Sequence, residues 1–306
     1  MTMQNNSFVA EASNLRVCYR VGRGRYFEAV RGMDLKVGRG EFFALLGPNG
    51  AGKTTCMLTM LGFIAPSAGE VRLLGNRPEP GAAVYEKVAY LPEEPLYPEF
   101  LTVREVMEYY ASLYRARITA GRIGELLERL GLSNRSSFLV RECSKGMRQR
   151  LGIAACMLNS PDLYFFDELT RGLDPLMLRS LREVMKDLHR SGATIVMNSH
   201  MLSEVETLCT SAAIMNKGKV VRHDTLNNLV GRMEGRFMVE TGDCPDFPEF
   251  AQVSARDNGR AVMEVAREHL TALLEFCDRQ GLEFYGCRQK TRTLEDIVCD
   301  LVEDDR

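Results

Sequence analysis

A glycine-rich loop that ends in Lys-Thr is the feature that most constrains how this chain can fold. The loop follows the apolar run from Glu41 to Leu46, and its nine residues are Gly47, Pro48, Asn49, Gly50, Ala51, Gly52, Lys53, Thr54 and Thr55. Residues with small side chains let consecutive backbone N–H groups surround a polyphosphate, and the next helix directs its positive dipole end at the same anion. Lys53 would reach the outer phosphates and the hydroxyl of Thr54 would bind Mg²⁺. The loop therefore predicts a site for a nucleoside triphosphate.

Composition argues against several classes of protein. The 39 lysines and arginines nearly balance the 41 aspartates and glutamates, so the formal charge of −2 gives no field that attracts nucleic acid. The 9 cysteines are scattered with no C-x-x-C pair, which is typical of free thiols in a reducing cytosol. No run of about 18 apolar residues occurs. We expect a cytoplasmic protein that neither crosses a membrane nor binds nucleic acid.

Apolar runs and helical periodicities alternate along the first part of the chain. We expect short strands between residues 8 and 46, strands at 69–75, 88–91, 163–166 and 193–197, helices at 54–61, 176–191 and 202–209, and a hairpin at 212–221. Between about residues 99 and 160 the apolar residues recur at helical spacing, which predicts a helical subdomain. Strand and helix in alternation predict an α/β fold with a mostly parallel sheet, together with an antiparallel β subdomain.

The composition changes beyond residue 230, where a polar loop at 241–246 separates further elements. Strands at 236–240, 261–266 and 283–287 and helices at 270–279 and 294–302 are expected there. We therefore predict two domains, residues 1–230 and a small α+β domain at residues 231–306.

Two adjacent carboxylates follow the predicted strand at 163–166. Asp167 and Glu168 come at the carboxyl end of a parallel strand, which is where an open α/β sheet binds its ligand. Asp167 would hold Mg²⁺ through water, and Glu168 would orient and polarise the water that attacks the γ-phosphate.

A second candidate anion site begins at Cys143. Ser144 is placed as the N-cap of the helical run up to Leu158, and Gly146 allows a close backbone approach. Two phosphate sites far apart in one chain make sense if the second faces the nucleotide of another subunit.

These motifs resemble those of the nucleotide-binding subunit of an ATP-binding-cassette (ABC) transporter, and the resemblance covers about residues 8 to 230. The family's P-loop NTPase motifs occur in order: the Walker A loop at 47–55, the signature at 143–147, the Walker B strand at 163–168, the D-loop Arg171-Gly172-Leu173-Asp174, and a switch histidine, His200. The resemblance implies that His200 contacts the γ-phosphate of ATP and that Asp174 belongs to the nucleotide site.

The resemblance also implies partners. Two cassettes, identical or different, close head to tail on two ATP molecules, so that each ATP lies between the Walker loop of one and the signature of the other. A separate transmembrane permease would hold the chain at the inner face of the cell membrane, with Tyr97, Phe100 and Leu101 as candidate docking residues. Tyr19 falls where the family stacks an aromatic ring on adenine, although an Arg/Gly insertion makes Tyr26 a rival.

Two departures from the family pattern stand out. Glu93 replaces the Q-loop glutamine; a carboxylate can still bind Mg²⁺ but cannot donate a hydrogen bond. Lys145 replaces a signature glycine and either adds positive charge near the partner's phosphates or faces solvent. Similar Ser-Lys-Gly-Met and Leu-Pro-Glu-Glu segments are familiar in drug and polysaccharide exporters, which favours an exporter. The alternatives are a soluble, non-transport cassette ATPase and a regulatory cassette subunit.

Overall fold

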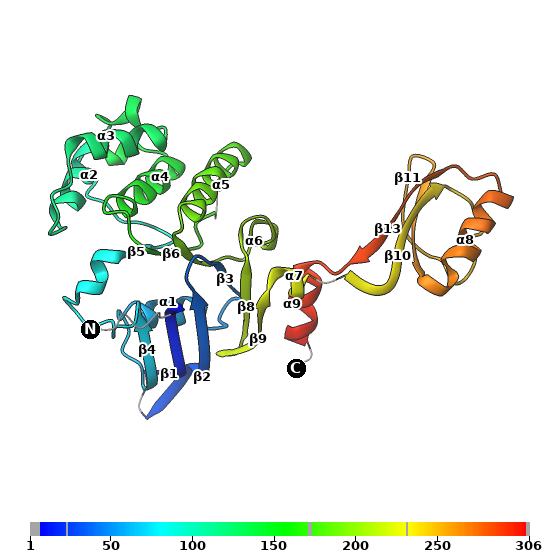
Figure 1. The fold of residues 1–306 in the computed structure, drawn as a ribbon, viewed down its shortest axis with the longest axis horizontal. Helices are drawn as coiled ribbons and strands as arrows, with labels where there is room; N and C mark the ends of the chain where they lie inside the picture. Colours follow the sequence, from blue (N-terminus) through cyan, green and yellow to red (C-terminus); the bar gives the residue numbers. More distant parts are fainter. Residues whose placement is uncertain (1–6, 23, 171–172, 231, 304–306) are drawn as a thin grey trace. The chain divides into compact units, whose positions relative to one another are not determined.

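The computed structural model describes residues 7–22, 24–170, 173–230 and 232–303, and the chain divides into two compact units between Leu226 and Asn227 (Figure 1). The residues from Leu301 on are grouped with the first unit. Our boundary after residue 230 stays a prediction of where the domains divide.

A six-stranded sheet forms the centre of the first unit. Its strands, in spatial order, are β5 (Val88–Leu91), β6 (Leu163–Asp167), β7 (Thr194–Asn198), β3 (Phe42–Leu46), β8 (Ser211–Asn216) and β9 (Lys219–Thr225). All neighbours are parallel except β8 and β9, which form the predicted hairpin. Every residue of β3, β6, β7 and β8 is buried, as expected of strands covered on both faces. Parallel pairing brings the carboxyl ends of β3, β6 and β7 to one edge.

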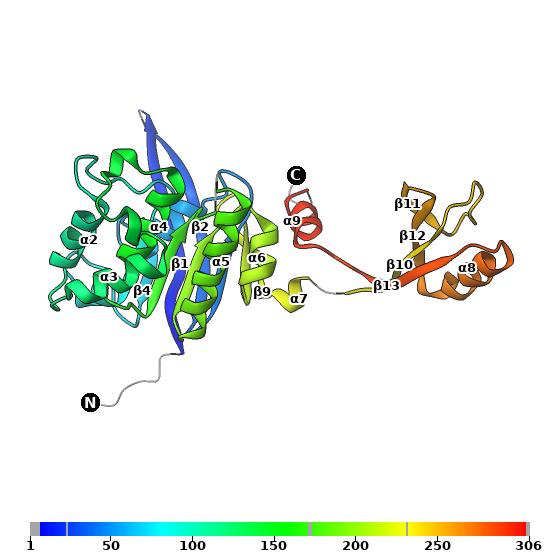
Figure 2. The ribbon, with the colours of Figure 1, turned by 90° about the horizontal axis from the view of Figure 1, so that it is seen from above.

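Helices and a second sheet cover the two faces of this central sheet. The helices are α1 (Lys53–Met60), α5 (Pro175–Arg190) and α6 (Leu202–Leu208), and a short helix, α7 (Leu226–Leu229), follows β9 where the chain passes into the second unit. An antiparallel sheet in the order β2 (Arg25–Gly38), β1 (Phe8–Gly22), β4 (Ala68–Leu73) lies with α1 on one side, and α5 and α6 lie on the other (Figures 1 and 2). The core between the sheets includes Leu35, Phe43, Cys56 and Met57. Burying one large apolar side chain is worth about 1.5–3 kcal/mol, so this core holds α1 firmly.

The predicted helical subdomain contains α2 (Val103–Ser112), α3 (Ala120–Arg129) and α4 (Lys145–Cys156). Thr102 begins α2 with a capping box in which Glu105 bonds back to its backbone, and the hydroxyl of Thr119 caps α3. Most of the apolar residues that recur at helical spacing here, among them Val106 and Leu126, are buried, but Leu113, at the end of α2, is 62% exposed. Local capping and a buried stripe together explain why this segment is helical.

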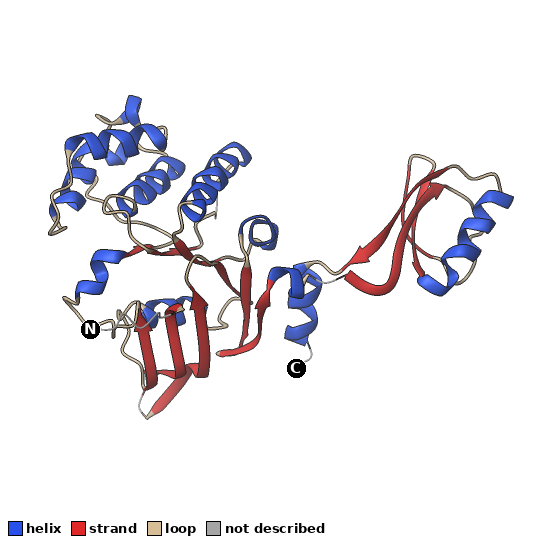
Figure 3. Ribbon diagram, in the orientation of Figure 1, coloured by secondary structure: helices blue, strands red, loops and turns tan. Residues whose placement is uncertain are grey.

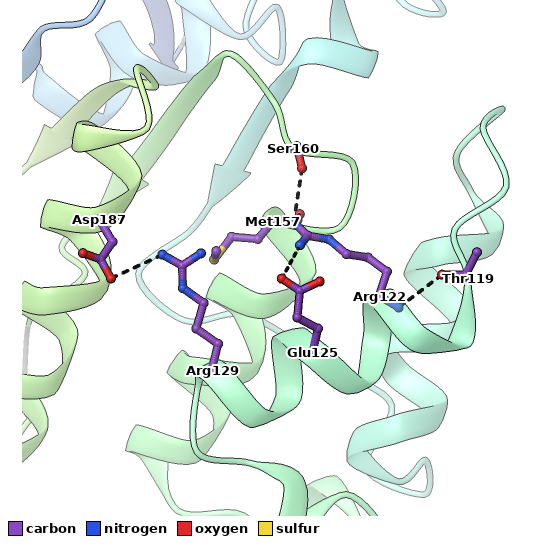
Figure 4. A network of polar contacts seen from close by, with 7 residues as sticks. All are labelled: Thr119, Arg122, Glu125, Arg129, Met157, Ser160 and Asp187. Carbon is purple, nitrogen blue, oxygen red and sulfur yellow. Dashed lines mark hydrogen bonds and ion pairs between the residues drawn. The ribbon is translucent and has the colours of Figure 1, made fainter.

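Two arginines of α3 hold this helix against the end of the helical subdomain and against α5 (Figure 4). Arg122 donates to the carbonyl oxygen of Met157 at 3.0 Å and to the hydroxyl of Ser160 at 3.1 Å, just before β6. Arg129 lies 3.5 Å from a carboxylate oxygen of Asp187 on α5. These contacts join segments that are far apart in the sequence.

The second unit is a four-stranded antiparallel sheet with a helix against it (Figure 3). Its elements are β10 (Arg232–Gly242), β11 (Gln252–Asp257), β12 (Arg260–Ala266), α8 (Arg267–Arg279), β13 (Phe284–Thr291) and α9 (Leu294–Glu303). Val239, Met263 and Leu273 are central to its core. We did not predict β11, because this edge strand exposes five of its six residues and lacks a clear apolar alternation.

Candidate functional site

The glycine-rich loop joins β3 to α1 in a conformation that depends on two of its glycines. Gly47 has φ 137°, and a Cβ there would lie 2.1 Å from the carbonyl oxygen of Met215. Gly52 has φ 99°, and a Cβ there would lie 2.4 Å from the carbonyl oxygen of Ala29. Gly52 is also the N-cap of α1, so no side chain bonds to the first N–H groups of this helix. Those groups are available to an anion.

Lys53 is held by the loop that precedes it. Its Nζ donates to the carbonyl oxygens of Gly47 at 2.7 Å and Pro48 at 3.1 Å. Burial lowers the pKa of Lys53, although the charges of Glu168 and Asp167 oppose that shift. A bound phosphate would offer this cation anionic acceptors in place of neutral carbonyls, which strengthens each hydrogen bond.

Asp167 is a buried carboxylate at the end of β6. Its Oδ1 accepts from the side-chain amide of Asn198 at 2.9 Å and from the hydroxyl of Thr54 at 3.5 Å. The pKa of Asp167 is raised, and burial is the largest cause. The hydrogen bonds from Asn198 and Thr54 partly offset that rise. A carboxylate and a hydroxyl oxygen this close are ligands that suit Mg²⁺, which binds to few protein groups when it also binds phosphates. Within the described residues no group of three or more His, Cys, Asp or Glu could hold a metal ion.

Glu168 and His200 meet at the ends of neighbouring strands. Nδ1 of His200 lies 2.5 Å from Oε2 of Glu168, whose side chain is only 13% exposed. Glu168 has φ 49°, a left-handed backbone conformation that costs a non-glycine residue roughly 1–2 kcal/mol. Its N–H donates to the carbonyl oxygen of Asn198 at 3.2 Å. The strained backbone thus directs the Glu168 side chain toward His200.

A cavity of about 430 Å³ brings most of the predicted residues together. Its lining consists of Tyr19, Phe27, Ala29, Asn49, Gly50, Gly52, Lys53, Thr54, Thr55, Glu93, Glu168 and His200. Gly47, Pro48 and Ala51 belong to the loop but not to this lining. A volume of this size suits a small-molecule ligand.

The aromatic end of the cavity differs from the sequence expectation. Tyr19 lines the cavity and its hydroxyl bonds to that of Thr55 at 3.3 Å, whereas its proposed rival Tyr26 is 69% exposed and is not part of the lining. Phe27, which we did not predict, lines the cavity because it pairs with Tyr19 across the β1–β2 hairpin. Asn198 was also missed as a partner of Asp167. Asn198 of β7 pairs with Asp167 of β6 in the parallel sheet, and this pairing was the signal that could have identified it.

Ser144 and Gly146, which we predicted to face the partner's nucleotide, and Asp174, which we predicted in the nucleotide site, lie outside this cavity. Ser144 caps α4 by accepting from the N–H of Met147, and Asp174 caps α5 by accepting from the N–H of Met177. A Cβ on Gly146 would lie 2.1 Å from Sδ of Met177, so the start of α4 packs closely against the start of α5. The D-loop residues Arg171 and Gly172 lie outside the described residues.

Comparison with known proteins decides the family. The family model described as ABC transporter matches residues 30–171. An uncharacterized ABC transporter ATP-binding protein of Nostoc sp. is 42% identical over 237 residues, which are 76% of this chain and 70% of that protein. The chain belongs to the ABC transporter family.

Further relatives agree with this assignment. A fluoroquinolones export ATP-binding protein of Mycobacterium tuberculosis is 38% identical over 214 residues, covering 69% of this ABC protein and 70% of the relative. A solved structure of an ATP-binding subunit of an ABC transporter matches with a TM-score of 0.65 and 32% identity, over 72% of this chain and 91% of the other. The predicted resemblance and the P-loop NTPase fold class are thereby confirmed. Among the helices that could be described, none is long and apolar enough to span a membrane.

Proposed function

We propose that this chain is the ATP-hydrolysing subunit of an exporter, and that it closes on ATP with a second cassette to drive a separate membrane permease from the cytoplasmic side. The observation that carries the proposal is the single cavity in which Lys53 of the phosphate loop meets the Glu168–His200 pair. The fluoroquinolones export relative supports the direction of transport.

The loop and α1 would hold the triphosphate of ATP. Lys53 would neutralise the outer phosphates, and Thr54 with Asp167 would hold Mg²⁺, while Glu93 lines the same cavity and adds negative charge near Asp167. When bound, Mg²⁺ supplies charge neutralisation on the β- and γ-phosphates. Asn198 keeps the Asp167 carboxylate in place by donating to it. Tyr19 would contact the base at the other end of the cavity.

Glu168 would act on the attacking water. Its carboxylate would accept a hydrogen bond from that water and orient it toward the γ-phosphate, and His200 would hold the carboxylate in position through the 2.5 Å contact. His200 also lines the cavity, so its ring would contact the γ-phosphate. ATP hydrolysis would then depend more on how Glu168 and His200 position the water and the γ-phosphate than on a covalent step.

The second cassette would complete the site. Ser144 and Gly146 at the start of α4, and Asp174 at the start of α5, would face the nucleotide of the partner, which agrees with their places outside the cavity. Lys145 lies next to Ser144 and would place a positive charge near those phosphates. The two chains are either copies of this one or one copy and a related cassette.

A second cavity is the proposed contact with the permease. It has a volume of about 270 Å³, and Pro95, Leu96 and Tyr97 line it together with residues of β5, α2 and α4. Leu96 of this lining is 90% exposed, and Phe100, which follows in the sequence but does not line the cavity, is 75% exposed, so the segment presents apolar surface that a permease segment would cover. The small domain at residues 231–306 would serve as an accessory to dimer contact or regulation.

Substitution of the carboxylate tests the mechanism. Glu168→Gln should leave ATP binding intact, lower turnover by about 10²-fold or more and trap a dimer, because the amide cannot accept the proton that the water gives up. Glu94→Gln is the matched control, since Glu94 follows Glu93 but does not line the nucleotide cavity. ATPase rates and gel filtration with ATP measure both effects. Unchanged turnover in Glu168→Gln would remove this carboxylate from the mechanism.

Mixed dimers test the head-to-tail arrangement. Ser144→Arg should inactivate the site that this residue completes on the partner, and Lys53→Ala should inactivate a chain's own site. Mixing the two variants should restore activity in dimers that keep one intact composite site. If neither single variant loses activity, the arrangement is wrong.

A further inference from the structure

An ion pair between a buried glutamate and a partly exposed arginine joins α5 and α6, the helices that follow β6 and β7. Glu204, in the first turn of α6, is a charged residue with only 1% of its side chain exposed. Nε of Arg182 on α5 donates to Oε2 of Glu204 at 2.8 Å, and the guanidinium Nη2 donates to the other carboxylate oxygen. Two parallel hydrogen bonds fix the carboxylate in direction as well as in distance. The pair therefore holds α6 in one orientation on α5.

The surroundings of the pair come from the segments that carry Glu168 and His200. Arg182 and Glu204 line a cavity of about 10 Å³ together with Phe166, Leu169 and Thr170, which flank Glu168, and with Met197 of β7. Apolar residues of α5 and α6 and Phe42 of β3 complete the lining. The pair thus contacts both chain segments whose ends meet in the Glu168–His200 contact.

The helix that follows His200 depends on such contacts for its position. Helix α6 has only seven residues, and no side chain caps its start at Met201. Isolated helices of this length are unstable in water, so tertiary packing must hold α6 in place. The N–H groups of Glu204 and Val205 both donate to the carbonyl oxygen of Met201, one residue after His200. A change in the position of Glu204 therefore moves the loop that carries His200.

We propose that Arg182 and Glu204 are positioning residues that keep the His200 imidazole against the Glu168 carboxylate. Neither residue lines the nucleotide cavity, so they act through α6 and through the residues that flank Glu168. An ion pair suits this task because its two fixed bonds allow one arrangement, whereas apolar packing tolerates small shifts. The consequence for turnover rests on the function proposed above, but the geometric part stands independently of it.

Nuclear magnetic resonance of the histidine rings tests the geometric part. The chain has only four histidines, His189, His200, His223 and His269, so ¹⁵N labelling of histidine gives few ring signals, and His200→Ala identifies the one of interest. The displacement of the His200 signal in Glu168→Gln serves as the reference, because that variant changes the side chain that His200 contacts. In Arg182→Lys, which keeps the charge opposite Glu204 but loses the two-bond fork, the His200 signal should move by at least half that displacement. The other three signals should stay in place.

Two further variants separate positioning from stability. The double replacement Arg182→Met/Glu204→Leu removes both charges and should fold with a melting temperature near that of the natural chain, yet its His200 signal should be displaced as in Arg182→Lys. Arg129→Gln/Asp187→Asn removes an exposed ion pair that also ends on α5 and should leave the signal unchanged.

The ATPase assay gives the second readout. In Arg182→Lys the turnover number should fall about tenfold while the KM for ATP changes less than twofold, because binding groups stay in place. A folded Arg182→Lys chain whose His200 signal keeps its natural position overturns the proposal. A displaced signal with unchanged turnover would leave the positioning role intact and count against the proposed catalytic role of His200.

Discussion

Phe27 offers a direct test of the proposal that this cavity binds the base of ATP. Its ring lies across the β1–β2 hairpin from Tyr19, lines the same cavity and is 49% exposed. An aromatic ring that stacks on a base contributes about 1–3 kcal/mol when measured by alanine substitution. Because Tyr19 also contacts this end of the cavity, we take about 1–2 kcal/mol for Phe27. Phe27→Ala should then weaken ATP binding about 5- to 30-fold.

The effect should depend on the base. Isothermal titration calorimetry with ATP and with inorganic tripolyphosphate separates the two ends of the ligand, since tripolyphosphate has the phosphates but no base. Phe27→Ala should weaken only the binding of ATP. Tyr26→Ala is the matched control, because this neighbour on the same strand is 69% exposed and lies outside the cavity lining. It should change neither affinity by more than about twofold.

Two results would refute this reasoning. Equal losses of ATP and tripolyphosphate affinity would mean that Phe27→Ala disturbs the phosphate loop rather than a base contact. Unchanged ATP affinity, or a Tyr26→Ala variant that weakens ATP binding as much, would mean that the base lies elsewhere.

Two further predictions concern stability. Gly52→Ala should lower the free energy of unfolding by about 2–3 kcal/mol in urea titrations, because Gly52 has φ 99° and an added Cβ would meet the carbonyl oxygen of Ala29. Gly50→Ala should lower it by only about 1 kcal/mol, because a Cβ there has open space around it. Asp167→Asn should stabilise the nucleotide-free chain at pH 7 while it impairs Mg²⁺-dependent turnover. The raised pKa of Asp167 means that the folded chain binds this proton more tightly than the unfolded chain, so ionisation destabilises the fold above the folded pKa. Thermal melts should show a gain that disappears near the ordinary pKa of 3.8, and a gain that persists there would contradict this cause.

Most of the fold in the first unit was predictable because its signals are local. The strand Leu163–Asp167 begins with four consecutive apolar residues, and α5 has an aspartate cap followed by proline at its start. Such patterns specify an element from residues within one or two turns of each other. The edge strand β11 was missed because its pairing with β12, rather than its own residues, makes it a strand.

Contacts between distant residues were less predictable. Asn198 could be named in the sequence, but only the register of β6 against β7 shows that it donates to Asp167. We predicted Tyr19 as the base contact with Tyr26 as its rival, and only the hairpin register, which places Phe27 opposite Tyr19, shows which rings line the cavity. A shift of one residue in that register would reverse which aromatic rings face the cavity.

The sequence by itself determined that this chain binds a nucleoside triphosphate in an α/β fold, because the loop spacing from Gly47 to Thr55 and the strand and helix that flank it are local properties. The tertiary structure alone decided that Glu168 contacts His200, 32 residues away, and that Arg182 holds Glu204. Those contacts depend on parallel strands that end at one edge and on how α5 and α6 pack, which are set by burial across the whole unit rather than by neighbouring residues.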